Sequence, residues 1–200
     1  MIKRIFDIVF SFIGLLLLSP LFLFISLFIL IDSKGGVFYK QKRIGKNRGS
    51  FLLFKFRSMY ADSDKKGLLT VGSKDVRVTK AGYLLRKYKL DELPQLINVL
   101  KGEMSLVGPR PEVEKYVDLY NEEQLKVLSV KPGITDYASI KYSNENELLS
   151  RVSNPEEVYV KEIMPAKLKL NLKYIMDSGM VTDVQIIFGT FRKIIGLKEN

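Results

Sequence analysis

The stretch Leu90–Glu112, LDELPQLINVLKGEMSLVGPRPE, begins with two adjacent carboxylates and ends near an arginine between two prolines. Asp91 suits the N-cap of a helix, and Glu92 opposes the helix dipole. Pro94 is tolerated in the first turn, and Gly102 suits the C-terminal end. Local physics therefore explains the stretch as a well-made helix. Adjacent helical residues also point about 100° apart, so a catalytic pair with divided roles fits the same residues.

Arg110 lies between Pro109 and Pro111. Both prolines fix φ, and each restricts the residue before it, so the arginine is presented on a stiff, extended backbone. A plain surface loop explains this segment most simply. A guanidinium fixed in this way also suits bidentate binding of a phosphate group.

The composition limits the chemistry that the chain can perform. Its 200 residues suit one domain, or one domain plus an anchor. The chain has no Cys and no His, which excludes disulfides, thiol nucleophiles, imidazole bases and the usual zinc sites. An enzyme of this composition would rely on carboxylates, with Lys, Tyr and hydroxyl groups as weaker options, and any metal would be a hard ion such as Mg²⁺.

The positive charge is concentrated in one block. Lys and Arg total 32 against 22 Asp and Glu, and residues 34–58 carry no acidic residue at all. Such a block indicates an anionic partner: phospholipid headgroups, nucleic acid or a phosphorylated substrate. The block lacks a groove-fitting or stacking motif, so we expect no nucleic-acid partner.

Residues 8–31 contain no charged side chain. As a helix they would extend about 36 Å, enough to cross a bilayer core of about 30 Å. Pro20 removes a helical hydrogen bond to Leu16 and kinks the helix, while the Ser19 hydroxyl can satisfy the freed carbonyl. Both flanks are basic. Because basic residues favour the cytoplasmic side, a helix that places the two flanks on opposite sides of a membrane is disfavoured. From these residues alone, a re-entrant helix and a kinked spanning helix both remain open.

The remaining chain is predicted to mix short strands with helices. We expect strands at 37–41 and 50–57 around a turn at 45–49, a polar loop at 62–74, a helix at 79–90, an exposed helix at 114–130, and loop with short helix at 143–157.

Two helices are predicted to close the chain. In the last one, Thr182 and Gln185 suit a capping box. An apolar stripe then repeats at helical spacing: Val184, Ile187, Phe188, Phe191, Ile194 and Ile195. Core packing and a position in a membrane interface both explain this stripe.

Taken together, these motifs resemble the bacterial sugar transferases, in particular the small monotopic phosphoglycosyl transferases. The matching segments are KRIFDIVFS (3–11), LLLLSPLF (15–22), YKQKRIGKN (39–47), FKFRSM (54–59), DVRVTKAGYLLRKYKLDELPQLINVLKGEMSLVGPRP (75–111) and KPGIT (131–135). They run nearly from end to end, and the combination of DELPQ with GPRP at this spacing is specific.

The resemblance implies an enzyme that transfers a sugar-1-phosphate from a UDP-sugar to undecaprenyl phosphate, with Mg²⁺, and releases UMP. This is the first membrane step in assembling bacterial capsule, O-antigen, exopolysaccharide or glycoprotein glycans. The implied fold is α+β and mostly helical. Residues 1–33 would form a re-entrant membrane helix broken at Ser19-Pro20. Residues 34–200 would form a catalytic domain with short strands and interfacial amphipathic helices, on the cytoplasmic face of the inner membrane.

The resemblance also assigns roles to the carboxylates. Asp91 would be the nucleophile that forms a covalent phosphosugar intermediate, with Glu92 as its partner, and Asp91 would also bind the metal. Attack on a diphosphate requires masking of its charge, which Mg²⁺ and fixed cations supply. The candidate cations are Lys55, Arg57, Arg77, Arg86 and Arg110. Further expected partners are an anionic bilayer and downstream glycosyltransferases.

One segment departs from the family pattern. KPGIT is commonly followed by Gly-Leu-Ala-Gln, but here it is followed by DYASIKY (136–142). The dyad is untouched, so the difference bears on sugar specificity if these residues line the sugar pocket. A non-catalytic scaffold for glycan assembly is the alternative function, although the chain retains both dyad carboxylates and Arg110.

Overall fold

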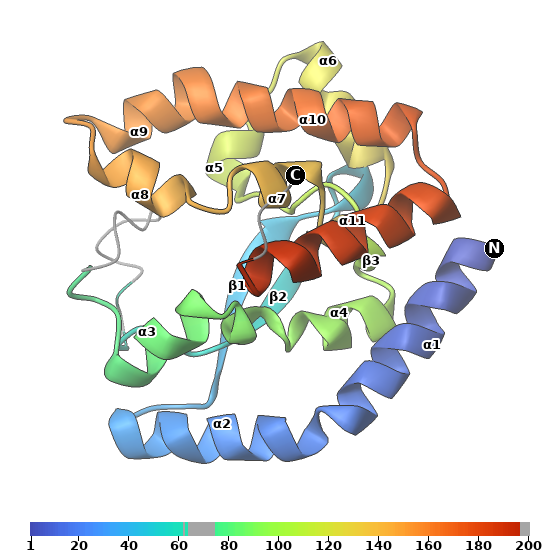
Figure 1. The fold of residues 1–200 in the computed structure, drawn as a ribbon. Helices are drawn as coiled ribbons and strands as arrows, with labels where there is room; N and C mark the ends of the chain where they lie inside the picture. Colours follow the sequence, from blue (N-terminus) through green and yellow to red (C-terminus); the bar gives the residue numbers. More distant parts are fainter. Residues whose placement is uncertain (62, 64–74, 197–200) are drawn as a thin grey trace.

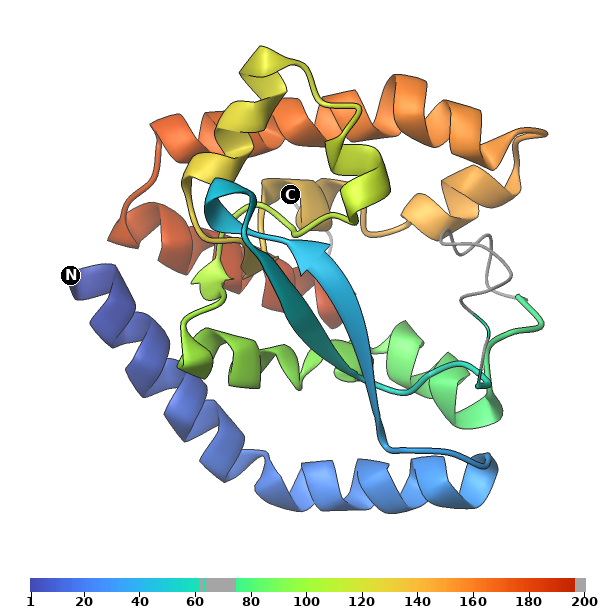
Figure 2. The ribbon, with the colours of Figure 1, turned by 180° about the vertical axis from the view of Figure 1, so that it is seen from behind.

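The computed structural model describes residues 1–61, 63 and 75–196; the loop predicted at 62–74 therefore lies almost wholly outside the described residues. The fold is mostly helical, with two small two-stranded sheets among the described residues, as the predicted α+β class requires. Figures 1 and 2 show the first two helices as a bent pair along one side of the molecule, with the later helices stacked beyond them.

The bent pair consists of α1 (Ile2–Leu17) and α2 (Ser19–Asp32), whose axes differ by 60°. The Ser19 hydroxyl donates to the Leu16 carbonyl at 2.7 Å, which satisfies the group that Pro20 leaves unpaired. The helix break predicted at Ser19-Pro20 is therefore confirmed. In the described part of the chain no single helix is long and apolar enough to cross a membrane, whereas α1 and α2 together meet that test by length and composition.

Polar residues of α1 bind the rest of the chain. Arg4 donates to two carbonyls at the end of α4 (Gln95–Lys101), at 2.6 and 2.9 Å. Asp7 is buried and accepts hydrogen bonds from the Ser105 hydroxyl and the next backbone N–H, at 3.0 and 2.9 Å, in β3 (Ser105–Val107). The first turns of α1 are thereby fixed to the segment that begins with Asp91.

The first sheet is an antiparallel hairpin of β1 (Phe38–Ile44) and β2 (Ser50–Phe56), which crosses the molecule in Figure 2. The predicted hairpin is confirmed, although β1 runs three residues beyond the expected 37–41. A short 3₁₀ turn at Lys46–Arg48 joins the strands. Leu53 is buried on one face of β2, while Lys55 lies two residues further along the strand.

The second sheet pairs β3 with β4 (Gly133–Thr135) in parallel. A Cβ atom on Gly133 would lie 2.1 Å from the backbone nitrogen of Gly108, so only glycine permits this approach. The sheet therefore brings the GPRP and PGIT motifs into direct contact.

The other helices are α3 (Lys80–Lys87), α5 (Glu114–Val117), α6 (Glu122–Leu125), α7 (Tyr137–Lys141), α8 (Glu145–Ser150), α9 (Pro155–Val158), α10 (Met164–Met176) and α11 (Met180–Ile194). The single helix predicted at 114–130 is wrong, because Asn121 and Gln124 form a capping box that starts α6 separately. A 3₁₀ turn at Lys126–Ser129 then follows α6.

The capping box predicted at Thr182 is also wrong. The last helix begins at Met180, and the Thr182 hydroxyl instead donates to the Asp177 carbonyl at 2.8 Å. Core packing does not explain the whole apolar stripe, since Phe188 and Phe191 are 66% and 62% exposed.

Candidate functional site

Asp91 lies inside a 3₁₀ turn, Leu90–Glu92, rather than at the N-cap of a helix. The predicted cap is wrong because α4 begins only at Gln95, after Pro94 at its N-cap. Lys89 adopts a left-handed conformation, with φ of 57°, which turns the chain sharply after α3. Helix α4 ends at Gly102, which adopts a left-handed conformation, so the predicted end of this helix is confirmed.

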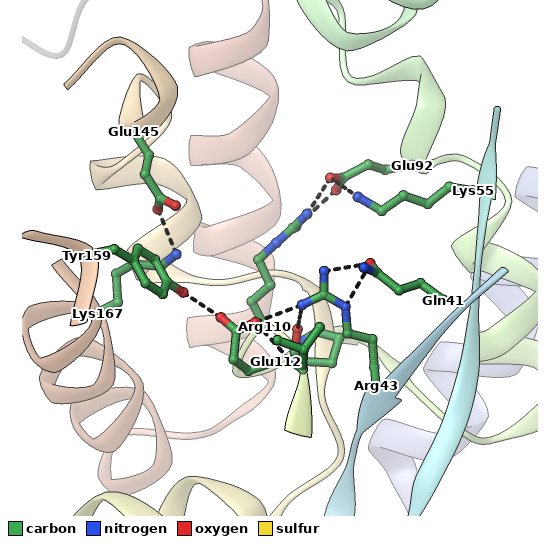
Figure 3. A network of polar contacts seen from close by, with 11 residues as sticks. Gln41, Arg43, Lys55, Glu92, Arg110, Glu112, Glu145, Tyr159 and Lys167 are labelled. Carbon is green, nitrogen blue, oxygen red and sulfur yellow. Dashed lines mark hydrogen bonds and ion pairs between the residues drawn. The ribbon is translucent and has the colours of Figure 1, made fainter. Parts of the chain in front are cut away.

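Glu92 is held by two cations. Arg110 donates through both terminal nitrogens to the two carboxylate oxygens, with Nη1 at 3.0 Å from Oε2, and Lys55 Nζ lies 3.2 Å from Oε1 (Figure 3). Burial opposes ionisation of Glu92, but the charges of Arg110 and Lys55 outweigh it and hold the pKa of this carboxyl well below its ordinary value. Glu92 is therefore an ionised anchor for the two cations.

Asp91 has a different environment. Its residue is 7% exposed, and it makes no hydrogen bond or ion pair with any described residue. Burial raises the pKa of Asp91, against the charge of Lys55, which lowers it. The adjacent carboxylates thus have different environments: Glu92 is paired, whereas Asp91 is not paired with any described residue. The division of catalytic roles considered from the sequence stays a prediction.

The loop that carries Arg110 is fixed from two sides (Figure 3). Arg43 on β1 donates to Glu112 at 2.8 Å and to the Pro111 carbonyl at 3.2 Å, and the Tyr159 hydroxyl also donates to Glu112. These contacts stiffen the loop beyond the effect of the two prolines. The sequence reasoning missed Arg43, Glu112 and Tyr159 as site residues. Two of them carried a signal: Arg43 lies in the matching segment 39–47, and Glu112 directly follows the GPRP motif.

Arg57 and Arg77 line the same cavity as the dyad but are bonded to other groups of the chain. The Arg57 guanidinium donates to the carbonyls of Ser33, at 2.7 Å, and Lys34, just after the end of α2. Arg77 pairs with Asp75 at 2.6 Å. Their assignment to the substrate's phosphates stays a prediction.

Arg86 completes the set of predicted cations. It lines the same cavity as Asp91 and makes no hydrogen bond or ion pair with a described residue. Its charge lowers the pKa of Asp91, which places it within electrostatic reach of the dyad. The structure therefore gathers Lys55, Arg86 and Arg110 around the carboxylates.

These residues line a cavity of about 1360 Å³. Its wall is charged at the dyad and apolar where helices α1 and α11 contribute Phe6, Phe10, Ile187 and Phe188. A ligand with a phosphate group and a long apolar part fits this division of the wall.

The residues present suit a metal ion bound largely by a substrate. No group of three or more acidic, His or Cys residues within the described ranges is placed to hold a metal. Of the two dyad carboxylates in the described chain, Asp91 offers unpaired oxygens, whereas those of Glu92 are occupied. Mg²⁺ is commonly bound through one or two carboxylates plus substrate phosphates, and this arrangement fits that pattern.

The chain belongs to the bacterial sugar transferase family, whose model matches residues 1–196. It is 36% identical over 199 residues to the UDP-N-acetylgalactosamine-undecaprenyl-phosphate N-acetylgalactosaminephosphotransferase of Aeromonas hydrophila, covering 97% of this chain and 44% of that protein. It is 40% identical over 200 residues to the undecaprenyl-phosphate glucose phosphotransferase of Komagataeibacter xylinus, covering 96% of this chain and 36% of that protein.

A third relative has a similar length. The uncharacterized sugar transferase EpsL of Bacillus subtilis (strain 168) is 38% identical over 194 residues, covering 97% of this chain and 87% of that protein. The chain thus spans less than half of the two relatives with named substrates and most of the third.

Proposed function

We propose that this protein transfers a sugar-1-phosphate from a UDP-sugar to undecaprenyl phosphate and releases UMP. One observation supports this most strongly: Asp91 is unpaired inside a cavity where Arg110 and Lys55 are held by the neighbouring Glu92. The names of two relatives point in the same direction: both specify undecaprenyl phosphate and a sugar, and one of them names a UDP-sugar.

The proposed reaction has two displacement steps. A carboxylate oxygen of Asp91 attacks the phosphorus that carries the sugar, the bond from that phosphorus to the bridging oxygen breaks, and UMP leaves. A phosphate oxygen of undecaprenyl phosphate then attacks the same phosphorus. The bond to Asp91 breaks, and the product is a polyprenyl diphosphosugar. The unpaired state of Asp91 suits it to be the nucleophile.

The cations lower the cost of bringing an anionic nucleophile to a diphosphate. Lys55, Arg86 and Arg110 stand ready to balance the charge that develops on the phosphate oxygens. Glu92 keeps two of these cations in place before the substrate arrives. Mg²⁺, bound by Asp91 and by phosphate oxygens, would further neutralise the diphosphate.

We also propose a monotopic arrangement on the cytoplasmic face of a bacterial inner membrane. Residues 1–33 would enter the bilayer as a re-entrant helix, and residues 34–200 would remain at the surface as the catalytic domain. The 60° bend and the exposed apolar side chains of α1, α2 and α11 support this arrangement. It would hold the site at the level of a lipid phosphate and next to downstream glycosyltransferases.

Release of UMP tests this function directly. Purified protein in detergent would be incubated with undecaprenyl phosphate, Mg²⁺ and each member of a panel of UDP-sugars. We expect UMP release with at least one donor, dependent on the lipid for multiple turnovers and abolished in Asp91→Asn. The exposed Asp118→Asn is the matched control and should retain activity. No turnover across the panel would favour the non-catalytic scaffold.

A further inference from the structure

Within the described ranges, three residues that line the large cavity each have a buried side-chain atom without a hydrogen-bond partner: Arg57 Nε, Ser139 Oγ and Asn171 Oδ1. The other nitrogens of Arg57 are bonded to carbonyls after α2, whereas Ser139 Oγ and Asn171 Oδ1 belong to neutral side chains of α7 and α10, and Asn171 is only 5% exposed. Both residues line the cavity that contains Asp91. Buried polar groups in folded proteins are nearly always hydrogen-bonded. The unsatisfied Ser139 hydroxyl and Asn171 side-chain carbonyl therefore indicate a ligand that supplies the missing hydrogen bonds.

Ser139 is tied to the loop that carries Arg110. Asp136, which is fully buried, accepts from the backbone N–H of Arg110 at 3.2 Å with one oxygen. Its other oxygen accepts from the backbone N–H of Ser139 at 2.6 Å and caps α7. The first turn of α7 is therefore held next to Arg110, which in turn contacts Glu92.

Asn171 approaches the same place from α10. It lies between Leu168 and Ile175 on one face of that helix, and these two side chains belong to clusters that include Tyr142 and Ile140 respectively. That face is thus turned toward α7 and the residues that follow it.

A second, small cavity also joins Asn171 to Arg110. It measures about 20 Å³ and is lined by both residues. Such a space is large enough for one water molecule, so a bound water is the competing partner for Asn171 Oδ1. Asn171 of α10 therefore shares a cavity with Arg110, and Ser139 of α7 is linked to the Arg110 backbone through Asp136.

We propose that Ser139 and Asn171 form a hydroxyl-binding wall beside Arg110 that contacts the sugar of the UDP-sugar and helps to select it. This inference rests on the proposed function. The Ser139 hydroxyl donates and accepts, whereas Asn171 Oδ1 accepts from an O–H or N–H group. A sugar carries uncharged hydroxyl groups, which match the neutral hydroxyl of Ser139 and the neutral amide oxygen of Asn171.

The sugar is the relevant part of the donor because of its place in the reaction. It is attached to the phosphorus that Asp91 attacks, whereas uridine is separated from that phosphorus by a second phosphate. The part of the donor beside Arg110 and the dyad is thus the sugar. Ser139 also belongs to DYASIKY, the segment that departs from the family pattern.

The experiment compares Ser139→Ala and Asn171→Ala with the wild-type full chain in detergent. Affinity is measured for UDP and for the UDP-sugar that the wild type binds best, and kcat/KM is measured for that donor and its hydroxyl epimers. Ser129→Ala and Asn144→Ala are the controls, since both residues are exposed and lie outside the cavity lining. The thermal midpoint of every variant is recorded.

We expect each cavity variant to weaken binding of the UDP-sugar by about threefold to tenfold, the value of one neutral hydrogen bond. The ratio of kcat/KM between preferred donor and epimer should fall by a similar factor, with UDP binding and the thermal midpoint unchanged. Equal weakening of UDP and UDP-sugar would overturn the assignment to the sugar. A changed thermal midpoint with unchanged selectivity would assign Asn171 to the small water site instead.

Failure of the proposed function has a different signature. The wild type would then release no UMP from any donor, while the comparison of UDP with UDP-sugar binding would still test the wall. An active wild type with unchanged selectivity in both variants would overturn the wall alone.

Discussion

Arg110 donates to both carboxylate oxygens of Glu92, the residue directly after Asp91, although the two partners lie 18 positions apart in the sequence. This pairing occupies one carboxylate of the dyad and leaves the other unpaired. It also holds the guanidinium inside the cavity, where a phosphate group of a donor would lie.

Neutralising Glu92 should disrupt this arrangement. In Glu92→Gln the amide no longer balances the charges of Arg110 and Lys55, so both cations lose the group that positions them. We expect kcat/KM for UMP release to fall by about a hundredfold, comparable to loss of one preorganised electrostatic group. Glu123→Gln, an exposed change, is the control. Activity within twofold of the wild type would contradict this role of Glu92.

The pH dependence should report on Asp91. Burial raises the pKa of Asp91 above its ordinary value, and a nucleophilic carboxylate must be ionised, so kcat/KM should rise with pH through that raised pKa. The charge of Lys55 opposes the shift. Lys55→Met should therefore move the acid limb to higher pH, while the exposed Lys169→Met leaves it in place. An acid limb that stays or moves to lower pH in Lys55→Met would refute this coupling.

Arg57 should act mainly on stability. Its guanidinium donates hydrogen bonds to two carbonyls just after the end of α2. Removing this charged donor should lower the free energy of unfolding by about 2 kcal/mol. For a chain of this size we expect Arg57→Met to lower the thermal midpoint by about 4–8 °C, with an unchanged KM for the UDP-sugar. Arg151→Met, at an exposed position, should change neither quantity. A raised KM at an unchanged thermal midpoint would instead support the phosphate contact predicted from the sequence.

The helix break should determine the membrane arrangement. Replacing Ser19 and Pro20 with leucine restores the helical hydrogen bond to Leu16 and removes the cause of the 60° bend. A cysteine placed at residue 2 should be inaccessible from outside intact cells in the parent chain and become labelled in the double variant. Labelling in the parent chain would refute the re-entrant arrangement, and no change in the double variant would assign the geometry to the flanking charges.

Local features of the fold followed from the sequence because neighbouring residues determine them. Pro20 removes a specific hydrogen bond, Gly102 tolerates a left-handed conformation, and alternation with turn residues defines the hairpin. The motifs also indicated the family, which the family model confirms. The predicted cap at Asp91 failed because Lys89 bends the chain into a 3₁₀ turn, an outcome that helix signals alone do not contain.

The arrangement around the dyad depends on contacts between distant segments. Tyr159 lies 47 positions from Glu112, and no spacing rule connects them. Arg57 shows the same limit, because its charge was visible in the sequence but the carbonyls after α2 that it bonds, 23 and 24 positions away, were not. Arg77 differs, since its partner Asp75 is only two positions away in the same motif.

The central claim is that Asp91 forms a covalent bond to the phosphosugar. The most direct measurement is peptide mass spectrometry of protein incubated with its UDP-sugar and Mg²⁺ without undecaprenyl phosphate, then quenched. We predict one phosphosugar per chain on the peptide containing Asp91, an equal amount of UMP, loss of the adduct on adding the lipid phosphate, and no adduct in Asp91→Asn. Turnover by wild-type protein with Asp91 unmodified at every time point, together with turnover by Asp91→Asn, would contradict the account.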